Sequence, residues 1–273
     1  MKIVVYCQHV LGVGHLFRTL EICKAMARHE VILTLGGPRI ETKLPDHVSI
    51  IQLPNLQMDP EFKGLFGSDK SASLDQIKEK RKKTLLALIK KERPHIFLLE
   101  LYPFGRKAFR FELDPVIEEI RSRPSSRCGV ISSVRDILVE KDNQQKHEGR
   151  VLETLNHYFD AVLIHSDPKV ITLDETFLRF AEINIPVAYT GYIAPKPPDR
   201  IRGSIRKQLG IKSKETLIVA SAGGGSVGKS LLEAAIQAEN TVVLYTSDHG
   251  VYVGEHGLFA KGIPSFRGAY GIP

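Results

Sequence analysis

The sequence predicts an α/β protein in which helices cover a parallel β-sheet. Short runs rich in Val, Ile and Leu alternate with longer amphipathic runs, and this alternation is typical of right-handed βαβ units. Polar residues stand directly after several of the apolar runs, at the edge where parallel sheets bind ligands. An apolar content of 42% with 25% charged residues is ordinary for a globular protein that can bury a core.

The predicted elements follow one another in βα order. The strand segments are apolar, β-branched and short, and they lie at residues 2–7, 31–35, 48–53, 95–100, 128–133, 161–165 and 187–189. The helical segments carry apolar residues at helical spacing, and they lie at residues 16–28, 74–91, 109–123 and 143–159. The stretch from 54 to 73 is polar and is expected to be irregular.

A proline cluster marks the clearest boundary. Ala194-Pro195-Lys196-Pro197-Pro198 can continue neither a helix nor a central strand, and favours an extended linker. A helix at 201–209, a strand at 216–220 and a helix at 230–238 are expected after it. We therefore predict a Rossmann-like domain over 1–194, an incomplete second Rossmann-like domain over 195–239, and a separate tail over 240–273.

The formal net charge of +7 is concentrated in one predicted helix. Its basic residues, interleaved with leucines, are Lys78, Lys80, Arg81, Lys82, Lys83, Lys90, Lys91 and Arg93. A solvated face of an amphipathic helix is the plainer interpretation. The alternative is a surface for an anionic partner, such as nucleic acid or a membrane headgroup layer.

Cysteines and hydropathy give weaker constraints. Cys7, Cys23 and Cys128 are far apart and form no CxxC pair, so neither a zinc site nor a disulfide framework is expected. The short apolar run after Met1 is not a signal peptide, and no apolar run approaches the roughly 20 residues of a membrane span. The chain is expected to be soluble and cytoplasmic.

The turn after the first strand contains Gly12, Gly14 and His15. Glycines there permit close approach of a ligand, and the following helix presents its N–H groups to an anion. The third glycine of the GxGxxG fingerprint is missing, so a plain structural turn is the alternative. His15 is either a general base or a residue that merely starts the helix.

Two later strands also end in charged residues. Glu100 stands at the end of an apolar run, where its carboxylate is placed to accept a hydrogen bond from a sugar hydroxyl. The alternative is a salt bridge to Arg106 or Lys107. Arg135-Asp136 follows the next strand, and an Arg–Asp pair is often structural.

A second glycine-rich loop, from Gly223 to Ser230, matches the P-loop pattern GxxxxGK[ST] letter for letter. Gly223, Gly224 and Gly225 follow a predicted strand and precede a predicted helix. A P-loop fold normally begins with this motif, whereas here it stands late in the chain. A glycine-rich loop that binds a sugar donor is therefore preferred to a nucleotide-hydrolysing site.

Several segments, taken together, resemble a known group. The run Tyr6-Cys7-Gln8-His9-Val10-Leu11-Gly12-Val13-Gly14-His15-Leu16-Phe17-Arg18 strongly resembles the start of the predicted glycosyltransferases related to glycosyltransferase family 28. Further matches occur in the same order at residues 100–106, 110–113, 133–139, 165–168, 189–195 and 221–225. The resemblance covers about residues 1–238.

This family is similar to the bacterial enzyme that adds N-acetylglucosamine to the lipid-linked peptidoglycan precursor. The resemblance implies two Rossmann-like domains of GT-B type facing across a cleft, with no required metal or other cofactor. A nucleotide-diphosphate sugar, UDP-linked as one candidate, would bind mainly the second domain, and an unknown hydroxyl acceptor the first. No nucleic-acid partner is expected, and peripheral membrane contact stays open.

The resemblance also implies roles for individual residues. Gly12, Gly14 and His15 would face the reacting centre, with His15 as the catalytic candidate. Arg18, Glu100 and Asp136 are motif positions on the substrate side. The glycines at 223–225 would approach the donor diphosphate.

From about Asn240 the sequence instead resembles an internal piece of a sulfatase, with Asp248-His249 and Lys261 in the pattern of a metal and sulfate site. Sulfatases also need a Cys/Ser-x-Pro-x-Arg segment, which this sequence lacks. We therefore expect a fusion or a shortened reading frame, with hexosyl transfer impaired by an incomplete donor domain. The alternative of another class is a non-catalytic binding module.

Overall fold

The protein is described by a computed structural model that covers residues 1–9, 14–37, 43–58, 64–67, 72–123, 128–139, 141–195, 201–212, 218–222 and 243–247. The chain divides into two compact units, Met1–Ile193 and Ala194–Pro273. In the described part of the chain, no helix is long and apolar enough to cross a membrane.

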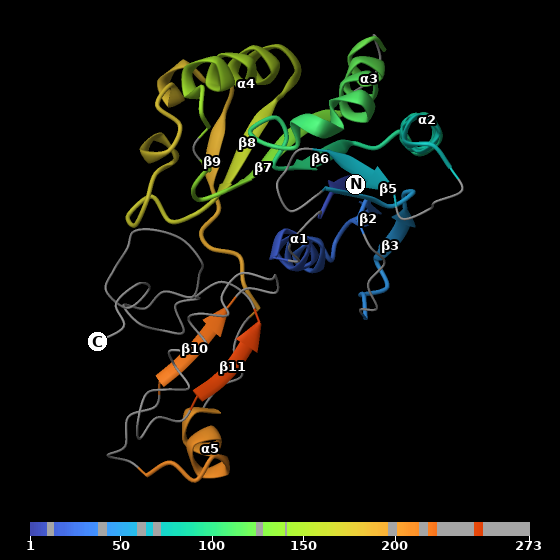
Figure 1. Cartoon of the computed structure of the whole chain (residues 1–273). Coiled ribbons are helices and arrows are strands. Elements are labelled where there is room, and N and C mark those ends of the chain that lie inside the picture. Colours follow the sequence, from blue (N-terminus) through green and yellow to red (C-terminus); the bar gives the residue numbers. More distant parts are fainter. Residues whose placement is uncertain are drawn as a thin grey trace. The chain divides into compact units, whose positions relative to one another are not determined.

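The first unit is built on a seven-stranded sheet in the order β3-β2-β1-β6-β7-β8-β9 (Figure 1). Every neighbouring pair in this sheet is parallel. The strands are β1 Lys2–Cys7, β2 Glu30–Leu35, β3 Val48–Gln52, β6 Ile96–Glu100, β7 Gly129–Arg135, β8 Ala161–His165 and β9 Val187–Tyr189. The predicted α/β class with a parallel, Rossmann-like sheet is therefore confirmed.

Four longer helices of this unit cover the two faces of the sheet. They are α1 Gly14–Ala25, α2 Leu74–Glu92, α3 Arg110–Arg121 and α4 Gln144–Tyr158. Three 3₁₀ turns accompany them, η1 Lys107–Phe109, η2 Leu173–Glu175 and η3 Phe180–Glu182. The chain steps from β1 outward to β3, crosses back to β6 and then steps the other way, so right-handed connections place helices on both faces.

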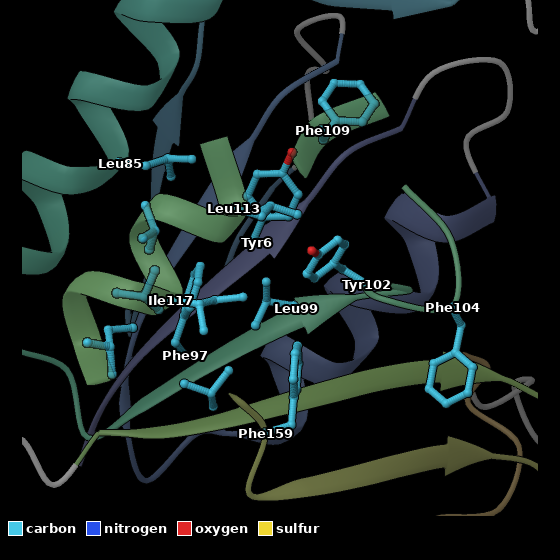
Figure 2. Packing of buried hydrophobic residues seen from close by; sticks show 14 of the residues in the cluster. Tyr6, Leu85, Phe97, Leu99, Tyr102, Phe104, Phe109, Leu113, Ile117 and Phe159 are labelled. Carbon is cyan, nitrogen blue, oxygen red and sulfur yellow. The ribbon is translucent and has the colours of Figure 1, made fainter. Parts of the chain in front are cut away.

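Two apolar cores result, because successive side chains of β1 point to opposite faces. Ile3, Val5 and Cys7 pack with Leu16 and Leu20 of α1. Val4 and Tyr6 belong to the larger core, formed with α2, α3 and α4. Figure 2 shows this larger core, in which Leu85, Leu113 and Ile117 approach the sheet from the helices.

A short antiparallel pair, β4 Leu56–Met58 with β5 Leu65–Gly67, lies in the stretch predicted to be irregular. That prediction was wrong for these residues. Both strands are short and lie in a polar stretch, without the apolar β-branched run that indicated the equally short β9.

Helix α2 begins with a capping box between Ser73 and Gln76, whose side chains each accept a hydrogen bond from the other residue's backbone. Most of its basic residues pair with carboxylates. The pairs are Lys78–Asp75, Lys82–Glu79, Lys83–Glu79, Lys90–Glu119 and Lys91–Glu92. Glu79 is shared by two lysines, and Glu92 and Glu119 also pair with Lys2 and Arg123, so these pairs offset the positive charge of the face only in part.

Arg81 corrects the prediction of a wholly solvated basic set, because its side chain is 0% exposed. Its guanidinium binds both carboxylate oxygens of Glu112, at 2.6 and 2.7 Å. It also donates to Gln8 and to the carbonyl oxygens of Gly36 and Pro54. Position 81 faces inward on the helix, and full pairing makes a buried guanidinium tolerable there.

In the second unit the described elements are helix α5 Ile201–Gln208 and the strands β10 Ile218–Ala222 and β11 Val243–Ser247. The two strands pair in parallel, with Ile218 opposite Val243 and Ala222 opposite Ser247. The helix predicted at 230–238 lies outside the described residues.

Candidate active site at the carboxyl edge of the sheet

Strand register brings together the polar residues that end three neighbouring strands. Glu100, the last residue of β6, lies opposite Ser133 of β7. Arg135, which ends β7, lies opposite His165, which ends β8. Strand β7 runs two residues past its predicted end at 133, so that Asp136 is the first residue beyond it. Helix α1 starts at Gly14, next to this edge, because it follows the central strand β1.

Glu100 is the centre of the resulting cluster. Its side chain is 2% exposed, and its Oε1 receives Nδ1 of His15 at 2.5 Å and Nη2 of Arg18 at 3.0 Å. Its Oε2 accepts hydrogen bonds from Nη2 and Nε of Arg106, at 2.8 and 3.2 Å. The salt-bridge alternative for Glu100 is therefore realised with Arg106, and the carboxylate holds three side chains at once.

The turn after β6 gives Arg106 this position. Leu101 has φ 63° and Arg106 has φ 59°, both in the left-handed region that non-glycine residues seldom adopt. The backbone N–H of Gly105 donates to Leu101 O at 2.7 Å, which closes the turn. Such conformations cost about 1–3 kcal/mol each and concentrate at functional sites. The two left-handed residues turn the chain so that the Arg106 side chain contacts the Glu100 carboxylate.

The charges around Glu100 determine the ionisation state of its carboxyl group. Burial by itself raises the pKa of this carboxyl group, but the charge of Arg106 and the contacts of His15 and Arg18 outweigh that effect, and the pKa falls well below its usual range. Glu100 is thus a carboxylate and can only accept hydrogen bonds. Its short contact with His15 therefore requires a proton on Nδ1 of the imidazole.

His15 itself is kept neutral at neutral pH. Burial lowers the pKa of the imidazole, the charge of Glu100 works in the opposite direction, and Arg106 and Arg18 lower it further. With the proton on Nδ1, Nε2 carries the lone pair, and within the described ranges no hydrogen bond engages it; the side chain is 26% exposed. A neutral imidazole, oriented by a carboxylate and open on its second nitrogen, can accept a proton from a hydroxyl group.

Asp136 and Arg135 lie beside this dyad. Asp136 is 4% exposed, and its Oδ1 is 3.5 Å from Nε of Arg135, beyond a good hydrogen bond. Burial raises the pKa of Asp136, and the charge of Arg135 opposes that rise. Among the described residues, no hydrogen-bond partner faces Oδ2 of Asp136, Nε of Arg135 or Nε of Arg18.

His165 has a structural environment. Its Nε2 lies 2.7 Å from Ser133 Oγ and its Nδ1 lies 2.8 Å from Thr190 Oγ1, so both ring nitrogens are engaged. Burial lowers its pKa to about 3, and the charge of Arg18 acts in the same direction. This histidine links the ends of β7 and β8 to the residue after β9.

Of the predicted glycines of the site, Gly14 alone lies in the described part of the chain. Gly14 opens α1, next to His15. Gly12, the donor-loop glycines Gly223, Gly224 and Gly225, and the sulfatase-like residues from Asp248 on lie outside the described residues. No cluster of metal-ligating side chains occurs within the described ranges. Arg106 is a site residue that the sequence indicated only as a salt-bridge partner.

No family model matches the sequence, and no curated protein matches it. Solved structures do match its fold. A sucrose-phosphate synthase from Thermosynechococcus elongatus superposes with a TM-score of 0.51 at 15% identity, covering 90% of this chain and 62% of that one. UGT2 of Phytolacca americana, solved with UDP-2fluoro-glucose and pterostilbene, gives a TM-score of 0.50 at 12% identity, covering 90% of this chain and 71% of that one.

This chain thus spans less than two thirds of the synthase and somewhat more of the plant protein. Likeness at such low identity establishes the fold. The α/β, Rossmann-like fold is that of GT-B glycosyltransferases.

Proposed function

We propose that the chain is a glycosyltransferase that moves a hexosyl group from a nucleotide-diphosphate sugar to a hydroxyl acceptor, with His15 as the general base. The observation that carries this proposal is the contact between His15 Nδ1 and Glu100, which leaves Nε2 of a neutral imidazole open at the carboxyl edge of the sheet. The GT-B fold supports the reaction class.

In the proposed step, the acceptor hydroxyl gives its proton to Nε2 of His15 while its oxygen forms a bond to the anomeric carbon of the sugar. The bond from that carbon to the diphosphate oxygen breaks, and the nucleoside diphosphate leaves with the electron pair. The imidazolium that forms is stabilised by the ionised Glu100, which itself keeps no proton. A positioned general base typically contributes about 10²–10⁴-fold to the rate.

We assign the acceptor side to residues 1–194 and the donor side to the segment that begins at 195, with Gly223, Gly224 and Gly225 near the diphosphate. The parallel strands β10 and β11 support this assignment, because the glycines directly follow the carboxyl end of β10 in the sequence. The plant neighbour holds a uridine nucleotide, so a UDP-sugar is the first donor to test. We place no metal and no other cofactor in the reaction.

The test is turnover of UDP-glucose and UDP-N-acetylglucosamine by the purified full chain, with and without a mixture of hydroxyl acceptors. Turnover is expected to fall about 10²–10⁴-fold in His15→Ala and to stay unchanged in His157→Ala, which removes an exposed histidine of α4. Unchanged turnover in His15→Ala overturns the assignment of the base. Slow turnover that still depends on His15 would match the expectation of an impaired enzyme, and a folded chain with none at all would contradict the proposed activity.

A further inference from the structure

A small cavity lies between the start of α3 and the first half of α4, and neither Glu100 nor any of its three side-chain partners lines it. The buried residues in its wall are Tyr102, Pro103 and Val151. The cavity volume is about 30 Å³. One water needs roughly 10–15 Å³, and a pocket for a whole drug-sized ligand has about 300 Å³ or more. The cavity therefore has room for one small chemical group.

Three long cationic side chains line the same cavity. Lys107 belongs to η1, Arg110 begins α3, and Arg150 lies in the first half of α4. Among the described residues that line the cavity, none carries a carboxylate. Cations from two segments of the chain, 40 positions apart in the case of Arg110 and Arg150, thus surround one space.

Two of these cations have no carboxylate partner. Within the described part of the chain, Nζ of Lys107 forms no hydrogen bond or ion pair, and the guanidinium of Arg150 donates only through Nε, to Lys146 O at 3.3 Å. Arg110 donates through Nε to Asp114 Oδ2 at 2.8 Å. One carboxylate therefore offsets the charge of three cationic groups.

This excess of positive charge around a partly enclosed space favours an anionic ligand, because little water is present there to screen the charges. A phosphate group suits the three cations better than a carboxylate does. Its oxygens point in several directions, so it can accept hydrogen bonds from donors on both sides of the cavity, and it carries up to two negative charges at neutral pH. A carboxylate has two oxygens in one plane and a single charge.

We propose that this cavity binds a phosphate group through Lys107, Arg110 and Arg150. The group belongs either to inorganic phosphate or to a small phosphorylated compound whose organic part stays outside the cavity. Because Tyr102 and Pro103 form part of the wall, the bound phosphate rests against the turn that follows β6. This inference goes beyond the proposed transferase function and does not depend on it.

The test is isothermal titration calorimetry on the full chain, with inorganic phosphate and glycerol 3-phosphate as probes and glycerol as the uncharged comparison. Both phosphates are expected to bind and glycerol is not. Lys107→Gln and Arg150→Gln are each expected to weaken binding about 10-fold, as for the loss of one hydrogen bond to a charged group. The matched control Lys146→Gln removes an exposed lysine of α4 that does not line the cavity, and is expected to bind like the parent chain.

The proposal is overturned if neither phosphate binds the parent chain, or if neither cavity variant weakens the binding. It is also overturned if Lys146→Gln weakens binding as much as the cavity variants do, since the effect would then come from surface charge in general. Lys107 is exposed, so its variant is expected to fold, and circular dichroism checks this.

The two probes separate the two sources of the phosphate group. Equal affinities support inorganic phosphate as the ligand. Tighter binding of glycerol 3-phosphate supports a phosphorylated compound, because the organic part then adds contacts with the protein outside the cavity.

Discussion

Nδ1 of His15 lies 2.5 Å from Oε1 of Glu100, although 85 positions of the sequence separate the two residues. The contact exists because β1 and β6 are neighbours in the sheet, so that the first turn of α1 stands over the end of β6. The orientation of the imidazole therefore depends on the sheet order, and not on any local motif.

If the two residues act as one unit, their substitutions are expected to be non-additive. Glu100→Gln should lower turnover of a UDP-sugar by about 10²-fold, because the imidazolium loses its counter-charge. The double variant with His15→Ala should be no slower than His15→Ala alone. Initial rates of the two single variants and the double variant check this. Glu153→Gln, at an exposed glutamate of α4, is the matched control, and additive losses would contradict the dyad.

Acid is expected to destabilise the fold through His165. Its pKa is about 3 in the folded chain against a usual 6.5, so from 6.5 downward the unfolded chain binds a proton that the folded chain does not. The free energy of unfolding should therefore fall with falling pH, by up to about 1.4 kcal/mol per pH unit from this group. Urea unfolding at about pH 7 and about pH 5 measures the slope.

His165→Gln should flatten that slope, even if it lowers stability at neutral pH. His15 and His147, whose pKa values are also lowered by burial, remain in the variant and keep part of the dependence. An unchanged slope in His165→Gln would mean that His165 is protonated normally in the folded chain.

Removing one partner of the buried ion pair between Arg81 and Glu112 is expected to destabilise the fold strongly. Arg81→Met leaves the Glu112 carboxylate buried without its counter-charge, which should cost about 3–5 kcal/mol of unfolding free energy. Lys82→Met, which removes a surface pair with Glu79, should cost no more than about 1 kcal/mol. Denaturant unfolding of the two variants compares them, and similar losses would refute the distinction.

The cysteines are expected to react slowly in the folded chain. Burial raises the pKa of Cys7 and of Cys23 to about 12, and that of Cys128 to about 11. Because the thiolate is the reactive form, little of it exists near neutral pH. Titration with a coloured disulfide reagent should detect the three thiols rapidly only in denaturant. Rapid reaction of a native thiol would show that its segment opens readily.

The sequence predicted the sheet well because its strands are apolar, β-branched runs, and β1 has the predicted bounds of 2–7. It failed where a residue's environment depends on a distant partner. Arg81 belongs to a run of basic residues, and its burial depends on partners far away in the sequence, above all Glu112 of α3. Strands β4 and β5 were missed because they are short and lie in a polar stretch of the sequence.

The candidate site was predicted in part. His15, Glu100 and Asp136 stood out as polar residues after strands, and the structure places them at one edge. Arg106 was offered only as one of two alternative salt-bridge partners of Glu100, and the left-handed backbone at Leu101 and at Arg106 itself accompanies that contact in the structure. A positive φ at a residue other than glycine is uncommon, and no pattern in this sequence predicts it.

The pairing of β10 with β11 has a consequence for how the chain could have arisen. Residues 218–222 belong to the part predicted from the sequence to resemble glycosyltransferases, and residues 243–247 to the part predicted to resemble a sulfatase, yet they are joined by a parallel ladder. If the two parts have separate origins, the junction falls inside one sheet, and the newer strand took over the hydrogen bonds of an older neighbour. Removing residues from 243 onward would then strip β10 of the partner it has among the described strands, and expose backbone groups that attract other chains.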